Sequence, residues 1–176
     1  NPGERVPDQQ VYQQDLALAL QAEGLGFDSV WSVEHHFTSY TMCPDVLQFL
    51  TYMAGATKSI QLGSMVCVLP WHDPLRVIEQ ISMLDNLSDG RLILGLGRGT
   101  GKVEFDGFRS EMSSARQRFK ESTEMVLNAI ENGYAEYHGE VIEQPRVDIR
   151  PRPIKSMRGR AYAAAVSPDS ARIMAE

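Results

Sequence analysis

The sequence has little that would indicate a disulfide-bonded, membrane-spanning or nucleic-acid-binding protein. Only two cysteines, Cys43 and Cys67, occur among 176 residues, with neither metal-type spacing nor a disulfide framework, which fits a reducing cytoplasm. No apolar run approaches the roughly 18 to 20 residues that a bilayer helix needs, and the first five residues do not resemble a signal peptide. The net charge of −6 argues against binding to nucleic-acid phosphates. We therefore expect a cytoplasmic protein with no nucleic-acid partner and no membrane segment.

The composition is that of one globular domain spanning residues 1–176. The apolar fraction of 43% is ordinary for a folded domain, and the chain has no low-complexity segment. The one basic cluster lies between Arg146 and Arg160, where prolines and a glycine are interleaved with the charges. This pattern predicts a solvated connector.

Short apolar strands alternate with amphipathic helices along the chain. Strands rich in β-branched or small apolar residues are predicted at 27–33, 60–69, 91–97 and 161–166. Helices are predicted at 7–23, at 44–57, at 74–88 after Asp73 as N-cap, from about 113 to Gly133, and from Ser167-Pro168 onward. Residues 134–150 interrupt this rhythm and predict a hairpin or a long loop.

Chemically versatile residues follow each predicted strand. Strands about thirty residues apart with one helix between them must be parallel, so their carboxyl ends lie on one face. The residues expected there are Glu34-His35-His36-Phe37 and the segments 69–73, 97–101 and 167–170. Acid–base groups, an aromatic ring, a cation and a glycine-rich backbone together predict a ligand site.

Two parallel architectures compete for this pattern. A dinucleotide-binding sheet would have Gly-x-Gly-x-x-Gly after its first strand, but the glycines at 95, 97, 99 and 101 miss that spacing. A TIM (β/α)8 barrel places functional residues at the ends of several strands, but it needs about 250 residues and eight strands. The α/β pattern therefore predicts about half of a barrel, either a piece of a longer polypeptide or a half-barrel with a partner.

Many ordered motifs resemble those of the bacterial luciferase-like flavin-dependent monooxygenases. They include Glu79 and the segments 26–37, 60–63, 69–70, 72–76, 83–85, 87–91, 95–99 and 105–108. The resemblance implies a TIM barrel, of which this chain supplies strands 2–5, while strand 1 and strands 6–8 are absent. It also implies reduced FMN as the cofactor, supplied by a separate flavin reductase, or the deazaflavin F420 in one branch of the family.

The resemblance further implies a reaction. Reduced FMN and O2 form a C4a-peroxyflavin, which oxygenates a small organic substrate, while the protein holds the flavin ring, excludes water and supplies a base. The substrate is not specified, because the family accepts several classes. Family members usually pair through early helices, so a homodimer that uses helix 74–88 is expected.

The resemblance places the catalytic histidine on His35, and an imidazole can take and return a proton near neutral pH. His36 is expected to face away from His35 and to have a supporting role. Glu34 is open between orienting an imidazole and lining the flavin pocket.

The cofactor-binding residues follow in the same way. Ser64, Met65 and Val66 match a segment with a non-prolyl cis peptide against the flavin ring, and Arg98 matches a phosphate contact. Further expected flavin contacts are Ser167, Ser170 and Glu79, although helix capping and an ion pair with Arg76 are alternatives for these. Trp71 and His72 are expected on the substrate side of the pocket.

Other functions stay open beside the FMN monooxygenase. They are an F420-dependent oxidoreductase of the same superfamily, a flavin-binding protein without turnover, and a zinc-dependent barrel hydrolase using Glu34, His35, His72 and Asp73. The hydrolase is least favoured, because the His-x-His pattern is absent and Arg98 would have no role. We therefore expect no metal.

Overall fold

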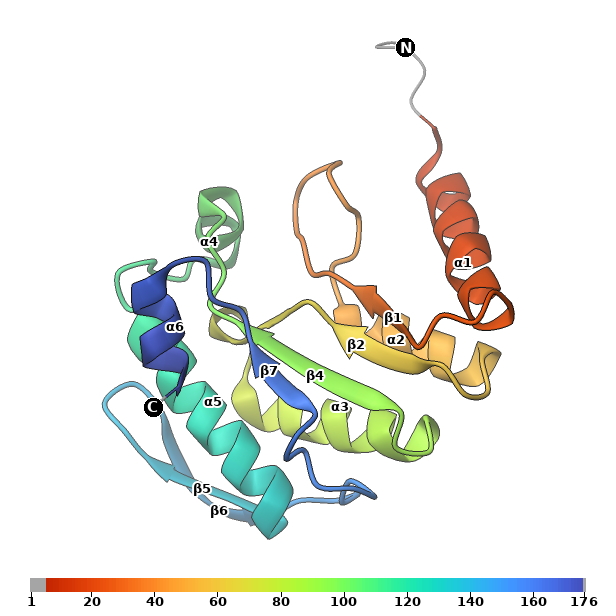
Figure 1. Cartoon of the computed structure of the whole chain (residues 1–176). Helices are drawn as coiled ribbons and strands as arrows, with labels where there is room; N and C mark the ends of the chain where they lie inside the picture. The colour runs from red at the N-terminus through yellow and green to blue at the C-terminus, as the bar shows by residue number, and fades with distance from the viewer. Residues whose placement is uncertain (1–5, 176) are drawn as a thin grey trace.

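Four parallel strands form the centre of the computed structural model, which describes residues 6–175 (Figure 1). They are β1 (Ser29–Ser32), β2 (Gln61–Ser64), β4 (Leu92–Gly97) and β7 (Ala161–Ala163). β1 pairs with β2, β2 with β4, and β4 with β7, all in parallel. The short β3 (Cys67–Val68) follows the cis peptide Met65–Val66 and also pairs with β4. Strands that adjoin in chain order are typical of a barrel wall, as the sequence predicts.

The helices are, in chain order, α1 (Asp8–Gly24), α2 (Val46–Ala56), α3 (Pro74–Leu87), α4 (Lys102–Phe108), α5 (Ala115–Asn132) and α6 (Pro168–Ala175), with a 3-10 turn η1 (Leu69–Trp71) after β3. Helices α2, α3 and α5 cover one side of this sheet, and α4 lies beyond the end of the strands (Figure 1). The core lies between the sheet and α2, α3 and α5. The other side of the sheet carries exposed rings such as Trp31 (38% exposed) and Tyr162 (57% exposed). That side corresponds to the interior of a barrel.

The third helix shows how local sequence produces the fold. Asp73 caps α3 by accepting the backbone N–H of Leu75 at 2.8 Å, and Pro74 occupies the first turn, where no N–H is needed. Ile78, Ile81 and Leu84 are fully buried, and each contributes about 1.5–3 kcal/mol of transfer free energy. Leu87, at the last turn, is 57% exposed.

Element ends differ modestly from the predictions. The helix expected at 44–57 begins at Val46, because Asp45 caps it through the N–H of Gln48. The strand expected at 60–69 divides at the cis peptide into β2 and β3. The segment 134–150 is a hairpin of β5 (Tyr134–His138) and β6 (Glu143–Asp148).

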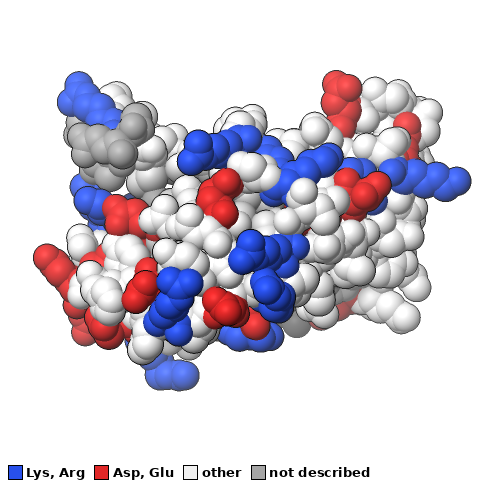
Figure 2. Space-filling view, turned by 90° about the horizontal axis from the view of Figure 1, so that it is seen from below, with Lys and Arg blue, Asp and Glu red and all other residues white. Residues whose placement is uncertain are grey.

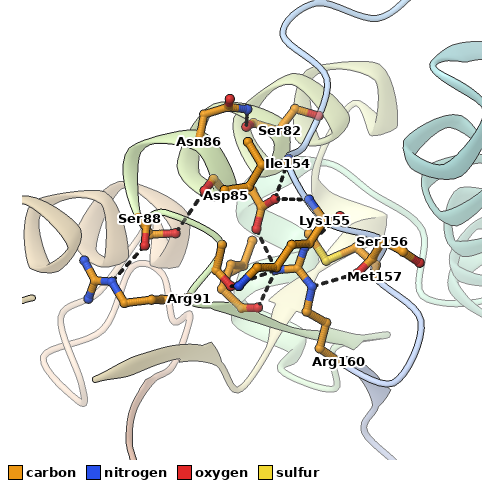
Figure 3. A network of polar contacts seen from close by, with 12 residues as sticks. Ser82, Asp85, Asn86, Ser88, Arg91, Ile154, Lys155, Ser156, Met157 and Arg160 are labelled. Carbon is orange, nitrogen blue, oxygen red and sulfur yellow. Dashed lines mark hydrogen bonds and ion pairs between the residues drawn. The ribbon is translucent and has the colours of Figure 1, made fainter. Parts of the chain in front are cut away.

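The basic segment before β7 is partly buried, in contrast to the solvated connector that the sequence predicts. Arg160 donates to Asp85 at 2.6 Å and to the carbonyl of Leu92 at 3.0 Å (Figure 3). Asp85 is fully buried and also accepts the backbone N–H groups of Ile154 and Lys155. The segment is therefore attached to α3 and β4, and it delivers β7 to the edge of β4.

Charge on the lower face of the molecule is mixed. Figure 2 shows Lys and Arg interspersed with Asp and Glu, without a face-wide area of one sign. Among residues 6–175, no helix has the length and apolar character to cross a membrane.

Glu23 connects α1 to the start of β2 and gives a prediction about pH. Its carboxylate accepts backbone N–H groups of Ser59, Ile60 and Lys58, and these bonds lower the pKa of Glu23 to about 2 from 4.5. Since the folded pKa is depressed, this stabilisation is present above about pH 4.5 and is lost as the pH falls toward about 2.

We therefore expect Glu23→Gln to be less stable than the wild type at neutral pH, with a difference that shrinks through this acidic window. Urea unfolding midpoints measured across a pH series test this. If the difference in stability between the wild type and Glu23→Gln stayed constant from neutral pH to about pH 2, this would contradict the role of the carboxylate.

Candidate functional site

A cavity of about 270 Å³ opens at the carboxyl ends of β1, β3, β4 and β7. It lies on the shared face that the strand pattern predicts. Polar, charged and apolar side chains line it. They include Glu34, His35, Val66, Trp71, Arg98, Glu104 and Ser170. The structure thus brings together residues from four separate segments of the sequence.

His35 presents an imidazole to this cavity and is held by a buried carboxylate. Its Nδ1 lies 3.0 Å from Oε1 of Glu104, which also accepts the backbone N–H of His36 at 3.2 Å. The His35 side chain is 38% exposed and that of Glu104 only 6%. A carboxylate acceptor favours the proton on Nδ1, which leaves Nε2 as the basic nitrogen of a neutral ring.

Glu34 contacts two other imidazoles instead of His35. Its Oε1 accepts Nε2–H of His72 at 2.7 Å and of His36 at 3.0 Å, while Oε2 accepts the backbone N–H of Val68 at 3.0 Å. Burial raises the pKa of Glu34, but the hydrogen bond and charge of His72, with the bonds from His36 and Val68, lower it overall. Glu34 therefore both lines the cavity and orients imidazoles, the two roles between which the sequence leaves it open.

The pKa of His72 is shifted by this network. Burial lowers the pKa of His72, but the hydrogen bond and negative charge of Glu34 outweigh burial and raise it. His72 is not among the residues that line this cavity, and its ring is bound by Glu34.

His36 belongs to an aromatic cluster and is buried. Its ring meets Trp71 and Phe108 edge to face at centroid distances of 5.3 Å and 4.6 Å. Adjacent His35 and His36 thus point to different surroundings, as the strand geometry predicts. Trp71 lines the cavity and forms part of the same cluster.

The cis peptide between Met65 and Val66 lies at the segment for which the family resemblance implies one. Both residues line the cavity. Ser64 does not: it is fully buried, and its hydroxyl bonds both the N–H and the carbonyl of Gly95. Ser64 thus joins β2 to β4 behind the cavity.

Arg98 lines the cavity between two glycines. A Cβ at Gly97 would lie 2.1 Å from Val66 Cγ2, and one at Gly99 would lie 2.7 Å from Val68 Cγ1, so larger residues would not fit. Gly99 also has a φ of +74°, which favours glycine. None of the described residues forms a hydrogen bond or an ion pair with the Arg98 guanidinium, so it is available to an anion in the cavity.

Ser170 contributes to the cavity from the first turn of α6. Its hydroxyl accepts the N–H groups of Val166 and Ser167, and Ser167 Oγ accepts the N–H of Ser170. These bonds are helix capping, the alternative weighed for this pair. Ser167 itself is not part of the lining.

Glu79 lies outside the cavity. Its carboxylate pairs with Arg76 three residues earlier, on the exposed surface of α3. The helical spacing explains this pair, and it leaves Glu79 apart from the other predicted flavin contacts.

One group of metal-type ligands occurs among residues 6–175: Glu34, Cys67 and His72, with ligand atoms within 4.8 Å of one another. Both oxygens of Glu34 already accept hydrogen bonds, from two imidazoles and the N–H of Val68. A metal ion would have to replace these bonds. His35 stands outside this group.

Glu104 is the site residue that sequence reasoning misses. It lies on α4, a seven-residue helix that begins after Gly101 and contains Gly107, so helix periodicity gives little signal there. Its partner His35 is 69 residues away in the sequence. The run of Phe105, Asp106, Gly107 and Phe108 marks the segment but does not single out Glu104.

A family model and known proteins match all or most of the chain. The model of the luciferase-like monooxygenase family matches residues 1–176. The alkanal monooxygenase alpha chain of Photobacterium leiognathi is 34% identical over 85% of this chain and 42% of its own length. The oxygenase component of the flavin-dependent trigonelline monooxygenase of Acinetobacter baylyi is 30% identical, over 95% of this chain and 48% of its own.

Solved structures agree with these matches. Monooxygenase RslO1 from Streptomyces bottropensis superimposes with a TM-score of 0.90 at 31% identity, over 98% of this chain and 53% of its own. Two structures share the fold at lower identity. The 3,6-diketocamphane monooxygenase of Pseudomonas putida with FMN has a TM-score of 0.72 at 19% identity, over 89% of this chain and 44% of its own. An F420-dependent secondary alcohol dehydrogenase has a TM-score of 0.77 at 18% identity, over 92% of this chain and 51% of its own.

The chain spans about half the length of the curated relatives that it matches. Its parallel strands and their flanking helices are accordingly part of a TIM barrel, as predicted. The chain belongs to the luciferase-like monooxygenase family.

Proposed function

We propose that the protein is a monooxygenase that uses reduced FMN and O2 to oxygenate a small organic substrate. The observation that carries this proposal is one cavity that contains both a carboxylate-held imidazole, His35, and a guanidinium without a partner among the described residues, Arg98. A base and an anion-binding group on the walls of one cavity are what a phosphorylated redox cofactor needs.

The residues present fit a flavin mononucleotide. Arg98, flanked by Gly97 and Gly99, suits the phosphate, and the Ser170 hydroxyl lies on the same cavity. Met65 and Val66 form an apolar wall suited to the flavin ring. Bound reduced flavin would supply the electrons and the reaction with O2.

The chain's own residues would control protons and water around that cofactor. His35 takes up and returns a proton at Nε2, because Glu104 holds the other ring nitrogen as a donor. Val68 and Trp71 line the cavity, where they would shield a bound cofactor from water. Glu34 and His36 hold the wall in place through their buried hydrogen bond.

A separate flavin reductase, a homodimer and a cytoplasmic location are further parts of the proposal. The trigonelline relative is an oxygenase component, a description that supports a partner reductase for this chain as well. Exposed apolar side chains on α2 and α3, namely Tyr52, Met83 and Leu87, support a subunit contact there.

F420 is the alternative cofactor, and one structure with the same fold is an F420-dependent enzyme. We favour FMN because three relatives at 30% identity or more are named as monooxygenases.

The test compares reduced FMN with reduced riboflavin, which lacks the phosphate. A charge-assisted hydrogen bond contributes about 1.5–3 kcal/mol, so we expect the wild type to prefer FMN by roughly tenfold or more. Arg98→Gln should remove most of this preference while leaving riboflavin affinity nearly unchanged. Arg158→Gln, with the same charge change on an exposed residue outside the cavity, is the control.

Equal loss of FMN and riboflavin affinity in Arg98→Gln would show that Arg98 acts on the fold of the cavity. An unchanged preference for FMN would remove Arg98 from the phosphate site.

A further inference from the structure

A second cavity borders Trp71 and Phe108 of the aromatic cluster. It has a volume of about 350 Å³, and its lining comes from η1, the end of α4, the segment that joins α4 to α5, and the start of α5. The residues that matter are Trp71, Phe108, Arg109, Glu111 and Arg118. Trp71 lines this cavity and the proposed flavin cavity, so the two are neighbours that share one ring.

Two buried donors on this lining have no acceptor. Nε1 of Trp71 and Nε of Arg118 are both inaccessible to solvent, and neither has a hydrogen-bond partner among the described residues. An unsatisfied buried donor is costly, so native structures rarely keep one without a ligand, ion or water to accept it. Trp71 and Arg118 border this cavity, and the two donor atoms themselves lie beneath its surface.

The charge of the lining favours an anionic acceptor. Arg109 and Arg118 contribute two guanidinium groups, and within residues 6–175 neither side chain forms a hydrogen bond or an ion pair. Glu111 contributes the one carboxylate, and it lies beyond ion-pair distance of both arginines. Guanidinium groups suit carboxylate and phosphate oxygens because their N–H donors match the spacing of two oxygens.

The backbone at Arg109 supports the same conclusion. This residue caps the end of α4 with a φ of 56°, in the left-handed region that glycine occupies at least cost. An arginine there carries a conformational penalty, so a use for its side chain is expected.

We propose that this second cavity binds the oxyanion group, carboxylate or phosphate, of a small molecule other than the flavin. Arg109 and Arg118 supply the charge. The stacked Trp71 and Phe108 rings, 25° apart in plane, form an apolar wall for the body of that molecule. The proposal stands independently of the flavin assignment.

Isothermal titration calorimetry on the full-length protein tests it, with benzoate and inorganic phosphate as separate probes. We expect at least one probe to bind with a dissociation constant of about 1 mM or tighter. Stronger binding of benzoate would identify a carboxylate ligand, and stronger binding of phosphate would identify a phosphorylated one.

Variants then locate the site. Arg118→Gln should weaken binding of the probe by roughly tenfold. Arg109→Gln, at an exposed residue, keeps the test available should Arg118→Gln fail to fold. Arg158→Gln is the matched control and should bind as the wild type does.

The proposal is overturned if neither probe binds, or if Arg109→Gln and Arg118→Gln bind both probes with wild-type affinity. Competition between the probe and saturating reduced FMN would also overturn it, because the anion would then occupy the flavin cavity. Simultaneous binding of the probe and FMN is the expected result.

Discussion

Replacement of His35 by alanine is expected to lower the turnover number roughly 10²–10⁴-fold, the usual contribution of a positioned general base. The reason is geometric: His35 is the imidazole that lines the cavity, and Glu104 at 3.0 Å holds its Nδ1. Affinity for reduced FMN should change little, because Arg98, and not His35, is proposed to hold the phosphate. The measurement is turnover with any substrate that the wild type oxygenates, beside the dissociation constant of the flavin.

Two further variants separate this role from a general loss of structure. Glu104→Gln keeps the size of the side chain but removes the charge, so we expect a smaller loss of turnover, about tenfold to a hundredfold. His138→Ala changes an exposed histidine of the β5–β6 hairpin and should be neutral. His35→Ala with at least a third of wild-type turnover would exclude His35 as the base.

Replacement of Asp85 by asparagine is expected to lower the free energy of unfolding by about 3–5 kcal/mol, the usual cost of breaking a buried ion pair. Asp85 is fully buried, Arg160 is 15% exposed, and their atoms lie 2.6 Å apart. The same carboxylate accepts the N–H groups of Ile154 and Lys155, so the substitution also weakens their bonds (Figure 3). Urea unfolding of the variant measures the loss.

Asp106→Asn is the matched control, because Asp106 forms an exposed ion pair with Lys102. Such pairs contribute at most about 1 kcal/mol. A second variant, Asp85→Leu combined with Arg160→Met, removes both charges and should recover part of the stability. Equal losses of unfolding free energy in Asp85→Asn and Asp106→Asn would mean that the buried ion pair contributes no more to stability than the exposed one.

Local sequence signals predict those parts of the fold that depend on local physics. The start of α3 follows from Asp73 and Pro74, which satisfy or remove the first backbone donors. The end of α5 follows from Gly133, which has a φ of 78° and ends the helix. Such signals involve residues a few positions apart, and the structure confirms them.

The predictions fail where the deciding partner is distant in the sequence. The residues around Arg160 predict a solvated connector, but the structure pairs Arg160 with the buried Asp85, 75 residues earlier. His72 is bound by Glu34, 38 residues earlier, a contact that the local sequence pattern does not indicate. Glu104 escapes notice for the same reason, since only the fold brings it to His35.

Family resemblance contributes what neither periodicity nor spacing contains. Met65 and Val66 look like ordinary strand residues, and only the resemblance marks their peptide bond as cis and their place on the cavity. In contrast, the grouping of Glu34 and His35 with Arg98 on one face follows from the parallel strands alone.

The most direct test of the proposed function is an anaerobic titration of the full-length protein with reduced FMN, followed by mixing with oxygenated buffer. The proposal predicts binding of one equivalent of reduced FMN, and it predicts that the visible absorbance of oxidised FMN returns more slowly than for the free cofactor. His35→Ala should bind the same equivalent and re-oxidise it faster. The proposal would be contradicted if the protein did not bind reduced FMN and instead bound F420 or stoichiometric zinc.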